Sequence, residues 1–369
     1  MSTLKVDNIR HNNATSDAIT MASDGTCTAK VTNPLSNRRL NYNGAMLINQ
    51  RGDSSNISAF SSYYGPDRYY SQGNASLNGT WNIGQSTDVP DGYGFKYSLS
   101  YDCVATTSNA NRYLMTVYRM EGVDCQLLNY GTANAKTVTL SFWIKCNKAG
   151  NFQVNFENEQ NPDAGYQTQQ TINSAGQWEK KVVTIPGDTT KALTFGTQKA
   201  FCFDIVYSAF GSYASQTPTA AWSALANEQR GTHCNMDLFD STSNYVRITG
   251  VQLELGDHAT DFEHLPYSDE LRRCQRYYEE TYYMDDAGGS YVRGPVYWKV
   301  EKRASGSPIV HAKRPDGVGT DTANKMYQGS GERDAQCVYS WTGGTMVNNT
   351  GSFNANQDII GRVSIDVEI

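Results

Sequence analysis

Charge, proline and long apolar runs are all scarce in this chain of 369 residues. Charged residues make up 18%, below the roughly 25% of an average soluble domain. No apolar stretch approaches the roughly 20 residues that a membrane span needs, and the N-terminus MSTLKVDNIRHNNATSD lacks the apolar core of a signal peptide. The net charge of -6 argues against a nucleic-acid binder, which would show a basic stripe. The sequence therefore predicts a protein made and assembled in a cytoplasm, with no nucleic-acid partner and no membrane span.

Patterns typical of metal sites and of catalysis are lacking as well. The eight cysteines are scattered without a C-x-x-C pair, so we expect free, mostly buried thiols rather than a zinc site or disulfides. No G-x-S-x-G, H-E-x-x-H or phosphate-binding glycine loop occurs, and no regular repeat is visible. His258 and His264 lie among acidic residues, but a loop fixes no ligand angles, so we favour a hydrogen-bonded crossing loop there. We therefore predict no enzyme, no catalytic residue, no metal site and no cofactor; Asp88, Asp91 and Asp102 are the candidate donors should a structural calcium ion bind.

Tyrosine (24) and glycine (32) are abundant, and short alternating segments recur along the chain. Residues 138–146 alternate well, and residues 152–156 follow after a Lys-Ala-Gly turn, which predicts a hairpin. Further strands are predicted within 95–101, 113–119, 178–185 and 193–207, the second of these with a helical alternative. About eight to ten short strands without a long helix predict an all-β antiparallel sandwich, with a jelly roll as its favoured version.

The stretch 245–280 joins this sandwich to the C-terminal region. Residues 245–255 alternate, with a slip of phase at Gly250 that predicts a bulge. A polar loop comes next, Pro266 stops the extended run, and a helix is predicted over 269–280. Ser268 is its candidate N-cap, and Asp269 and Glu270 suit the positive first turn.

The order of residues in VQLELG and ATDFEHLPYSDELRRCQRYYEE resembles that in tail-fibre and virion-appendage proteins of marine bacteriophages, including cyanophages. In them this string closes a jelly roll like that of carbohydrate-binding modules, and a phrase similar to NGAMLINQRG opens it. Segments similar to MSTLKVDNI and ITMASDGT begin such proteins and attach them to the virion, and KVEKRASGSPIV is similar to fibre tips. The resemblance implies a tail fibre or similar appendage, built as a homotrimer and located in the virion.

Three regions are predicted on this basis: a virion-attachment and oligomerisation arm (1–36), a jelly-roll sandwich (37–266), and a helix with a small β domain that can form a distal tip (267–369). The arm has too little apolar surface to fold alone. Its candidate attachment residues are Leu4, Val6, Ile9, Ile19 and Met21.

The predicted function is non-enzymatic binding of host-surface polysaccharide, with other virion proteins as partners of the arm. Tyrosine and tryptophan suit sugar contacts because a ring stacks on C–H faces while its polar tip stays hydrated. The glycan-binding candidates are Tyr63, Tyr64, Tyr69, Tyr70, Trp81, Tyr93, Tyr339 and Trp341, and each of them has packing in a core edge or a subunit interface as the alternative. Two other functions stay open: a purely structural collar, nozzle or head-decoration protein, and a polysaccharide depolymerase.

Overall fold

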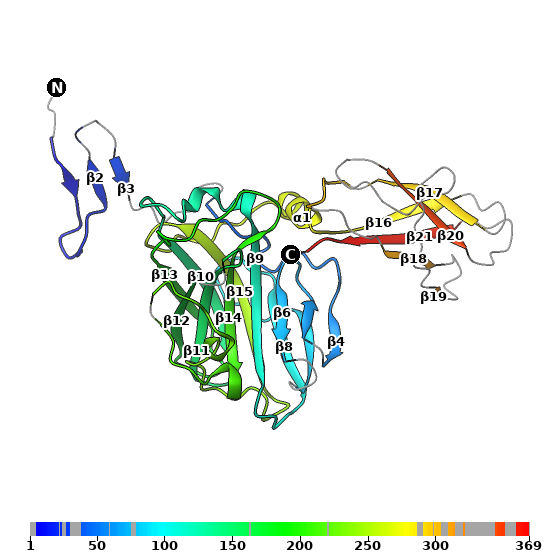
Figure 1. The fold of residues 1–369 in the computed structure, drawn as a ribbon, viewed down its shortest axis with the longest axis horizontal. Coiled ribbons are helices and arrows are strands. Elements are labelled where there is room, and N and C mark those ends of the chain that lie inside the picture. Colours follow the sequence, from blue (N-terminus) through cyan, green and yellow to red (C-terminus); the bar gives the residue numbers. More distant parts are fainter. Residues whose placement is uncertain are drawn as a thin grey trace.

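The computed structural model describes residues 5–21, 23, 27–29, 38–58, 60–74, 79–161, 164–219, 221–285, 291–297, 299–303, 309–313, 320–321, 344–350 and 359–368. Regular structure in these residues is mainly β-strand. A small N-terminal sheet is followed by two six-stranded antiparallel sheets, a single α-helix and a C-terminal group of strands (Figure 1). The predicted all-β class, with an antiparallel sandwich between an arm and a helix-led C-terminal region, is confirmed.

The N-terminal arm is a three-stranded sheet in the order β1 (Asn8–Ile9), β2 (Ile19–Met21) and β3 (Cys27–Ala29). It lies apart from the sandwich, at the left of Figure 1. Ile9 and Met21 are 45% and 39% exposed, Val6 and Ile19 are half-buried, and Leu4 lies outside the described residues. Strands of two or three residues bury little apolar surface, so this sheet presents apolar side chains to solvent.

The sandwich consists of two sheets whose neighbouring strands are all antiparallel. The first sheet has the order β13 (Glu179–Ile185), β10 (Val138–Cys146), β15 (Tyr245–Leu255), β8 (Ser98–Ala105), β7 (Thr80–Ser86) and β4 (Ser54–Ile57). The second has the order β12 (Gly165–Ile172), β11 (Gly150–Asn158), β14 (Lys199–Ala209), β9 (Tyr113–Glu121), β6 (Tyr70–Gly73) and β5 (Ser61–Tyr63). The chain crosses repeatedly from one sheet to the other, as in a jelly roll.

The core lies between the two sheets. Every second side chain of β10 and β11 is fully buried there: Leu140, Phe142, Ile144, Phe152, Val154 and Phe156. The ring centroids of Phe142 and Phe152 are 6.2 Å apart. The predicted hairpin of these two segments is therefore wrong, because β10 pairs with β13 and β15 while β11 pairs with β12 and β14. Because β10 and β11 lie in opposite sheets, their apolar faces pack against each other in the core.

The bulge predicted in β15 is confirmed. Ser141 of β10 pairs with Gln252, and Trp143 pairs with Thr249, so β15 carries an extra residue between these pairs. Gly250 lies there with a φ of 61°, a left-handed conformation that glycine adopts without steric cost. The strands at 54–86 were not predicted, because Ser, Asn and Gly interrupt their alternation.

Helix α1 spans Tyr267–Gln275 and is shorter than predicted. Pro266 holds the N-cap position and no side chain caps the helix, so the predicted Ser268 cap is wrong: Ser268 lies inside the first turn. The helix ends early because Tyr278 begins strand β16 (Tyr278–Asp285). Among the described residues, no helix is long and apolar enough to cross a membrane.

The C-terminal strands form two small groups. One sheet has the order β16, β21 (Ile359–Asp366), β18 (Ile309–Lys313) and β19 (Thr320–Asp321), and β17 (Tyr291–Tyr297) pairs with β20 (Gly344–Thr350). The sequence predicts strands at 291–300, 308–310 and 359–369, which correspond to β17, β18 and β21. A further strand, predicted at 337–341, lies outside the described residues. Because β16 and β21 are antiparallel neighbours, β21 runs back to the sandwich beside α1 (Figure 1).

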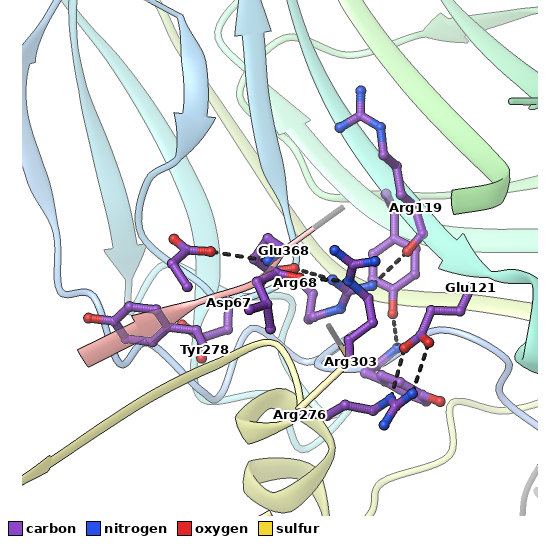
Figure 2. Close-up of polar contacts among 12 residues, drawn as sticks. Asp67, Arg68, Arg119, Glu121, Arg276, Tyr278, Arg303 and Glu368 are labelled. Carbon is purple, nitrogen blue, oxygen red and sulfur yellow. Dashed lines mark hydrogen bonds and ion pairs between the residues drawn. The ribbon is translucent and has the colours of Figure 1, made fainter. Parts of the chain in front are cut away.

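A network of buried charges holds this return at the sandwich (Figure 2). Arg68 is 1% exposed; it donates to the Glu368 carboxylate and, over 2.7 Å, to the carbonyl oxygen of Arg119. Arg276, just after α1, donates to both carboxylate oxygens of Glu121 at 2.8 and 2.9 Å. The end of α1 is thus bound to β9 directly, and Glu368 after β21 is bound to it through Arg68.

Candidate functional site

A groove of about 650 Å³ opens on the outer face of the first sheet, beside β10 and the start of β13. Its lining residues are Thr87, Asp88, Val89, Pro90, Asp91, Tyr93, Trp143, Lys145, Gly176, Gln177 and Trp178. Tyr93, Trp143 and Trp178 give it an aromatic character that the polar residues interrupt. The groove thus brings accessible rings and polar side chains together.

Trp143 enters the groove because of the alternation of β10. Phe142 and Ile144 point into the core and are fully buried, so Trp143 between them points outward and is half-buried. The bulge of β15 makes room for it. A Cβ atom on Gly250 would lie 2.6 Å from Cζ of Phe95 and 3.1 Å from Cδ1 of Trp143, so glycine is needed here for its small size as well as its φ.

Tyr93 also lines the groove and is 53% exposed. Its ring centroid lies 4.4 Å from that of Trp143, with 48° between the ring planes. It sits between Gly92 and Gly94, whose φ values are 82° and 76°. One glycine in the left-handed conformation thus precedes Tyr93 and another follows it, and glycine adopts this conformation at little cost.

Asp88 links two other residues of the groove, Lys145 and Trp178. Its carboxylate accepts hydrogen bonds from Nε1 of Trp178 at 3.0 Å and from Nζ of Lys145 at 3.0 and 2.8 Å. The hydroxyl of Ser98 donates to the Asp88 carbonyl oxygen at 2.7 Å, which anchors the loop. Asp88 therefore orients Trp178 and neutralises Lys145.

The remaining polar groups can act on a ligand. Asp91 and Gln177 are exposed and line the groove, and a carboxylate and an amide both bind hydroxyl groups. Aromatic rings bind apolar C–H faces while their polar edges remain hydrated. A ligand that presents flat C–H faces and many hydroxyl groups meets both requirements, and sugars have this chemistry.

Of the predicted glycan-binding residues, Tyr93 lines this groove, whereas Tyr69 and Trp81 are fully buried. Their prediction as sugar contacts is wrong for the folded chain. Tyr69 accepts a hydrogen bond from Nδ2 of Asn41, and Trp81 packs edge to face with Phe239. Both belong to the hydrophobic core because they point between the sheets.

Tyr63 and Tyr70 lie on the second sheet, away from the groove. Their rings contact each other edge to face, with centroids 5.1 Å apart. The guanidinium of Arg51 lies 5.2 Å from the Tyr63 ring centroid, and that of Arg119 lies 4.7 Å from the Tyr70 ring centroid. These faces are occupied by cations of the chain itself. Tyr64 is half-buried against the core, and Tyr339 and Trp341 lie outside the described residues.

Trp143 and Trp178 were missed by the sequence reasoning. The alternation that placed Phe142 and Ile144 on the buried face also places Trp143 on the polar face, beside Lys145. A large aromatic residue on the polar face of a strand is the signal that could have found it. Trp178 follows a Gly-Gln turn, and nothing local in the sequence distinguishes it from a core residue.

Only one group of side chains in the described residues has the spacing of a metal site: Glu157, Cys202 and Asp204, whose ligand atoms lie within 4.8 Å of one another. Arg230 donates to Glu157 at 2.6 Å and to Asp204 at 3.0 Å. Burial, reinforced by the neighbouring Glu157, raises the pKa of Asp204 well above its ordinary value. The guanidinium already neutralises this cluster, and we assign no metal to it.

The three candidate calcium donors make different contacts. Asp88 binds Lys145 and Trp178, as described above, and Asp102 binds Nη2 of Arg247 at 2.5 Å. Asp91 is exposed in the groove. The absence of a cofactor therefore stays a prediction, with a structural calcium ion as its alternative.

No protein-family model and no curated protein matches the chain. Among solved structures, it is similar to the enzymatically active domain of tailspike protein 4 of bacteriophage CBA120, at 10% identity and a TM-score of 0.31; the match covers 55% of this chain and 21% of that one. It is also similar to a putative sugar-binding protein from Bacteroides thetaiotaomicron, at 13% identity, a TM-score of 0.30 and coverage of 59% and 100%. A family 11 carbohydrate-binding module from Clostridium thermocellum, in complex with a β-1,3-1,4-mixed-linked tetrasaccharide, is 12% identical, with a TM-score of 0.26 and coverage of 58% and 98%. These likenesses concern the fold alone, and no residue takes its role from them.

Proposed function

We propose that this chain is a non-enzymatic glycan-binding protein of a bacteriophage virion, a tail fibre or similar appendage that binds host-surface polysaccharide. The observation that carries glycan binding is the groove, where Tyr93, Trp143 and Trp178 lie beside exposed Asp91 and Gln177. A shallow groove that sets three aromatic rings among polar groups suits binding of a sugar chain.

The virion setting is supported by the segments MSTLKVDNI, NGAMLINQRG and ATDFEHLPYSDELRRCQRYYEE, which resemble those of phage appendages. In this proposal residues 1–36 dock on the particle, 37–266 bind glycan and 267–369 project beyond the sandwich. The exposed Ile9 and Met21 of the arm suit contacts with virion proteins and with sister chains in a homotrimer. Several copies would then turn weak sugar contacts into firm attachment, because the later contacts are intramolecular.

Binding to a glycan array, followed by calorimetry with the sugar bound best, tests the groove. We expect Trp143→Ala to weaken binding at least about tenfold, as for an aromatic hot spot at an interface. Phe195→Ala is the matched control, since Phe195 is 70% exposed and does not line the groove. Equal binding by the wild type and Trp143→Ala, or no binding by the wild type, would refute the proposal and favour a purely structural virion protein. Release of reducing sugar from host polysaccharide would favour a depolymerase.

The arm is tested separately. Removal of residues 1–36 is expected to convert a trimer to a monomer in sedimentation equilibrium and to leave the affinity of each sandwich for sugar unchanged. A trimer that persists without the arm would refute its role in oligomerisation.

A further inference from the structure

We infer that His264 is a positioning residue of the groove, which holds Tyr93 in place through a hydrogen bond to the Tyr93 backbone. The inference rests on the proposed glycan-binding function of the groove. It assigns a role to a histidine that the sequence shows only as part of a polar loop.

The contact is direct. Nε2 of His264 lies 2.9 Å from the carbonyl oxygen of Tyr93. A carbonyl oxygen only accepts, so Nε2 carries the hydrogen in this bond. The bond joins the loop after β15 to the loop before β8, which are far apart in the sequence and meet at the rim of the groove.

The imidazole, on a residue that is exposed to solvent, packs in an aromatic triad. The ring of His264 lies 5.1 Å from Phe95 and 4.8 Å from Phe262, and the rings of Phe95 and Phe262 are 5.0 Å apart. Phe95 is buried and packs close to Gly250 of the β15 bulge. The bulge, Phe95 and His264 therefore form one continuous support from the sheet to the Tyr93 loop.

The loop needs this support because of its composition. Gly92 and Gly94 flank Tyr93, and glycine loses more conformational freedom on ordering than any other residue. The bond from His264 ties the backbone of this loop to a distant part of the chain. A loop ordered before the sugar arrives avoids that entropic cost at binding.

His258, in the same loop, offers a matched control. Its Nδ1 is 3.0 Å from Oδ1 of Asp257, and it takes no part in the triad. We therefore compare His264→Ala and His264→Phe with His258→Ala. His264→Phe keeps an aromatic ring against Phe95 but removes the donor, so it isolates the hydrogen bond if His264→Ala folds poorly. His264→Gln restores a donor of similar reach.

Two measurements decide the inference. With an array of cello-, xylo-, laminari- and manno-oligosaccharides as probes, we expect His264→Phe and His264→Ala to raise the Kd about 2- to 10-fold, the cost of ordering one side chain on binding. His264→Gln is expected to recover most of the affinity, and His258→Ala to match the wild type. Hydrogen exchange of the peptide around residues 89–96, measured without sugar, should accelerate in His264→Phe and return toward the wild-type rate in His264→Gln.

The outcomes separate this inference from the proposed function. If Trp143→Ala loses binding while His264→Phe keeps both wild-type affinity and wild-type exchange, the positioning role is wrong and the glycan-binding function stands. If no probe binds the wild type, the proposed function lacks support, and the exchange measurement still decides whether His264 orders the loop.

Discussion

Replacing Arg68 by methionine should detach the C-terminal strands from the sandwich. Arg68 and Glu368 are a buried ion pair, with side chains 1% and 2% exposed. The Arg68 guanidinium also lies 3.4 Å from the ring centroid of Tyr277. Methionine fills a similar volume but leaves the Glu368 carboxylate buried with weaker compensation, since its other cation, Arg51, is 3.5 Å away.

The expected loss can be worked from these contacts. Breaking a buried pair by removal of one partner costs about 3–5 kcal/mol, and the nearby Arg51 places the expected value at the low end, about 3 kcal/mol. Replacement of both partners, as in Arg68→Met with Glu368→Leu, removes the stranded charge and should recover all but about 1 kcal/mol, because apolar residues of similar volume replace buried pairs well.

Hydrogen exchange measures this locally. The Val367 amide donates to the Tyr277 carbonyl oxygen at 2.8 Å and should exchange about 100-fold faster in Arg68→Met, which corresponds to about 3 kcal/mol of opening free energy. Arg112→Met is the control for loss of an arginine, because Arg112 forms a partly exposed ion pair with Asp237 at 2.7 Å away from the C-terminal strands. An acceleration below fivefold, or a double variant as labile as the single one, would refute the reasoning.

Three further predictions concern single groups. Burial raises the pKa of Asp67 to about 6 from an ordinary 3.8; since the folded state holds this proton more tightly, the free energy of unfolding should fall by about 3 kcal/mol as the pH rises from about 4 to about 6. Urea titrations across this range should show a smaller fall in Asp67→Asn, and an identical fall would contradict the assignment. Gly250→Ala should destabilise the sandwich by about 1–3 kcal/mol in the same titrations and weaken sugar binding, because its Cβ would collide with Phe95; unchanged stability would show that the bulge relaxes. At pH 8 a thiol reagent should label exposed Cys27 rapidly and Cys103 only on unfolding, since burial raises the pKa of Cys103 to about 11; peptide mapping that finds both labelled at once would contradict the burial.

Much of the sandwich can be predicted from local patterns. The alternation of residues 138–146 and 245–255 predicted β10 and β15. The phase slip at Gly250 predicted the bulge in β15, which shifts the β10–β15 register between Ser141 and Trp143. The partners of β10 and β11 could not be predicted correctly, because alternation shows that a strand has an apolar face and not which of the two sheets it joins. The helix boundary failed for a related reason: Tyr278 suits both a helical stripe and a strand.

The candidate site was less accessible to sequence reasoning. A cluster of aromatic residues at 63–93 contains both core and surface members, and its composition does not separate Trp81, fully buried on β7, from Tyr93, exposed in the loop before β8. Trp143 could have been found from its place on the polar face of β10. The bond between His264 and Tyr93 joins residues that only the closed sheet brings together, so no local pattern reveals it.

The position of β15 has a consequence for biosynthesis. β15 is the last strand of the sandwich to emerge from the ribosome, yet it lies between β10 and β8 in the middle of its sheet; β14, emerging just before it, lies between β11 and β9. Until β14 and β15 are both made, the earlier strands of each sheet form two separate groups with unpaired edges. Pairings between such distant segments close slowly, and open edges favour aggregation in the meantime. A low growth temperature, which weakens hydrophobic association, should therefore raise the yield of native protein, and nascent chains released before residue 255 should be insoluble.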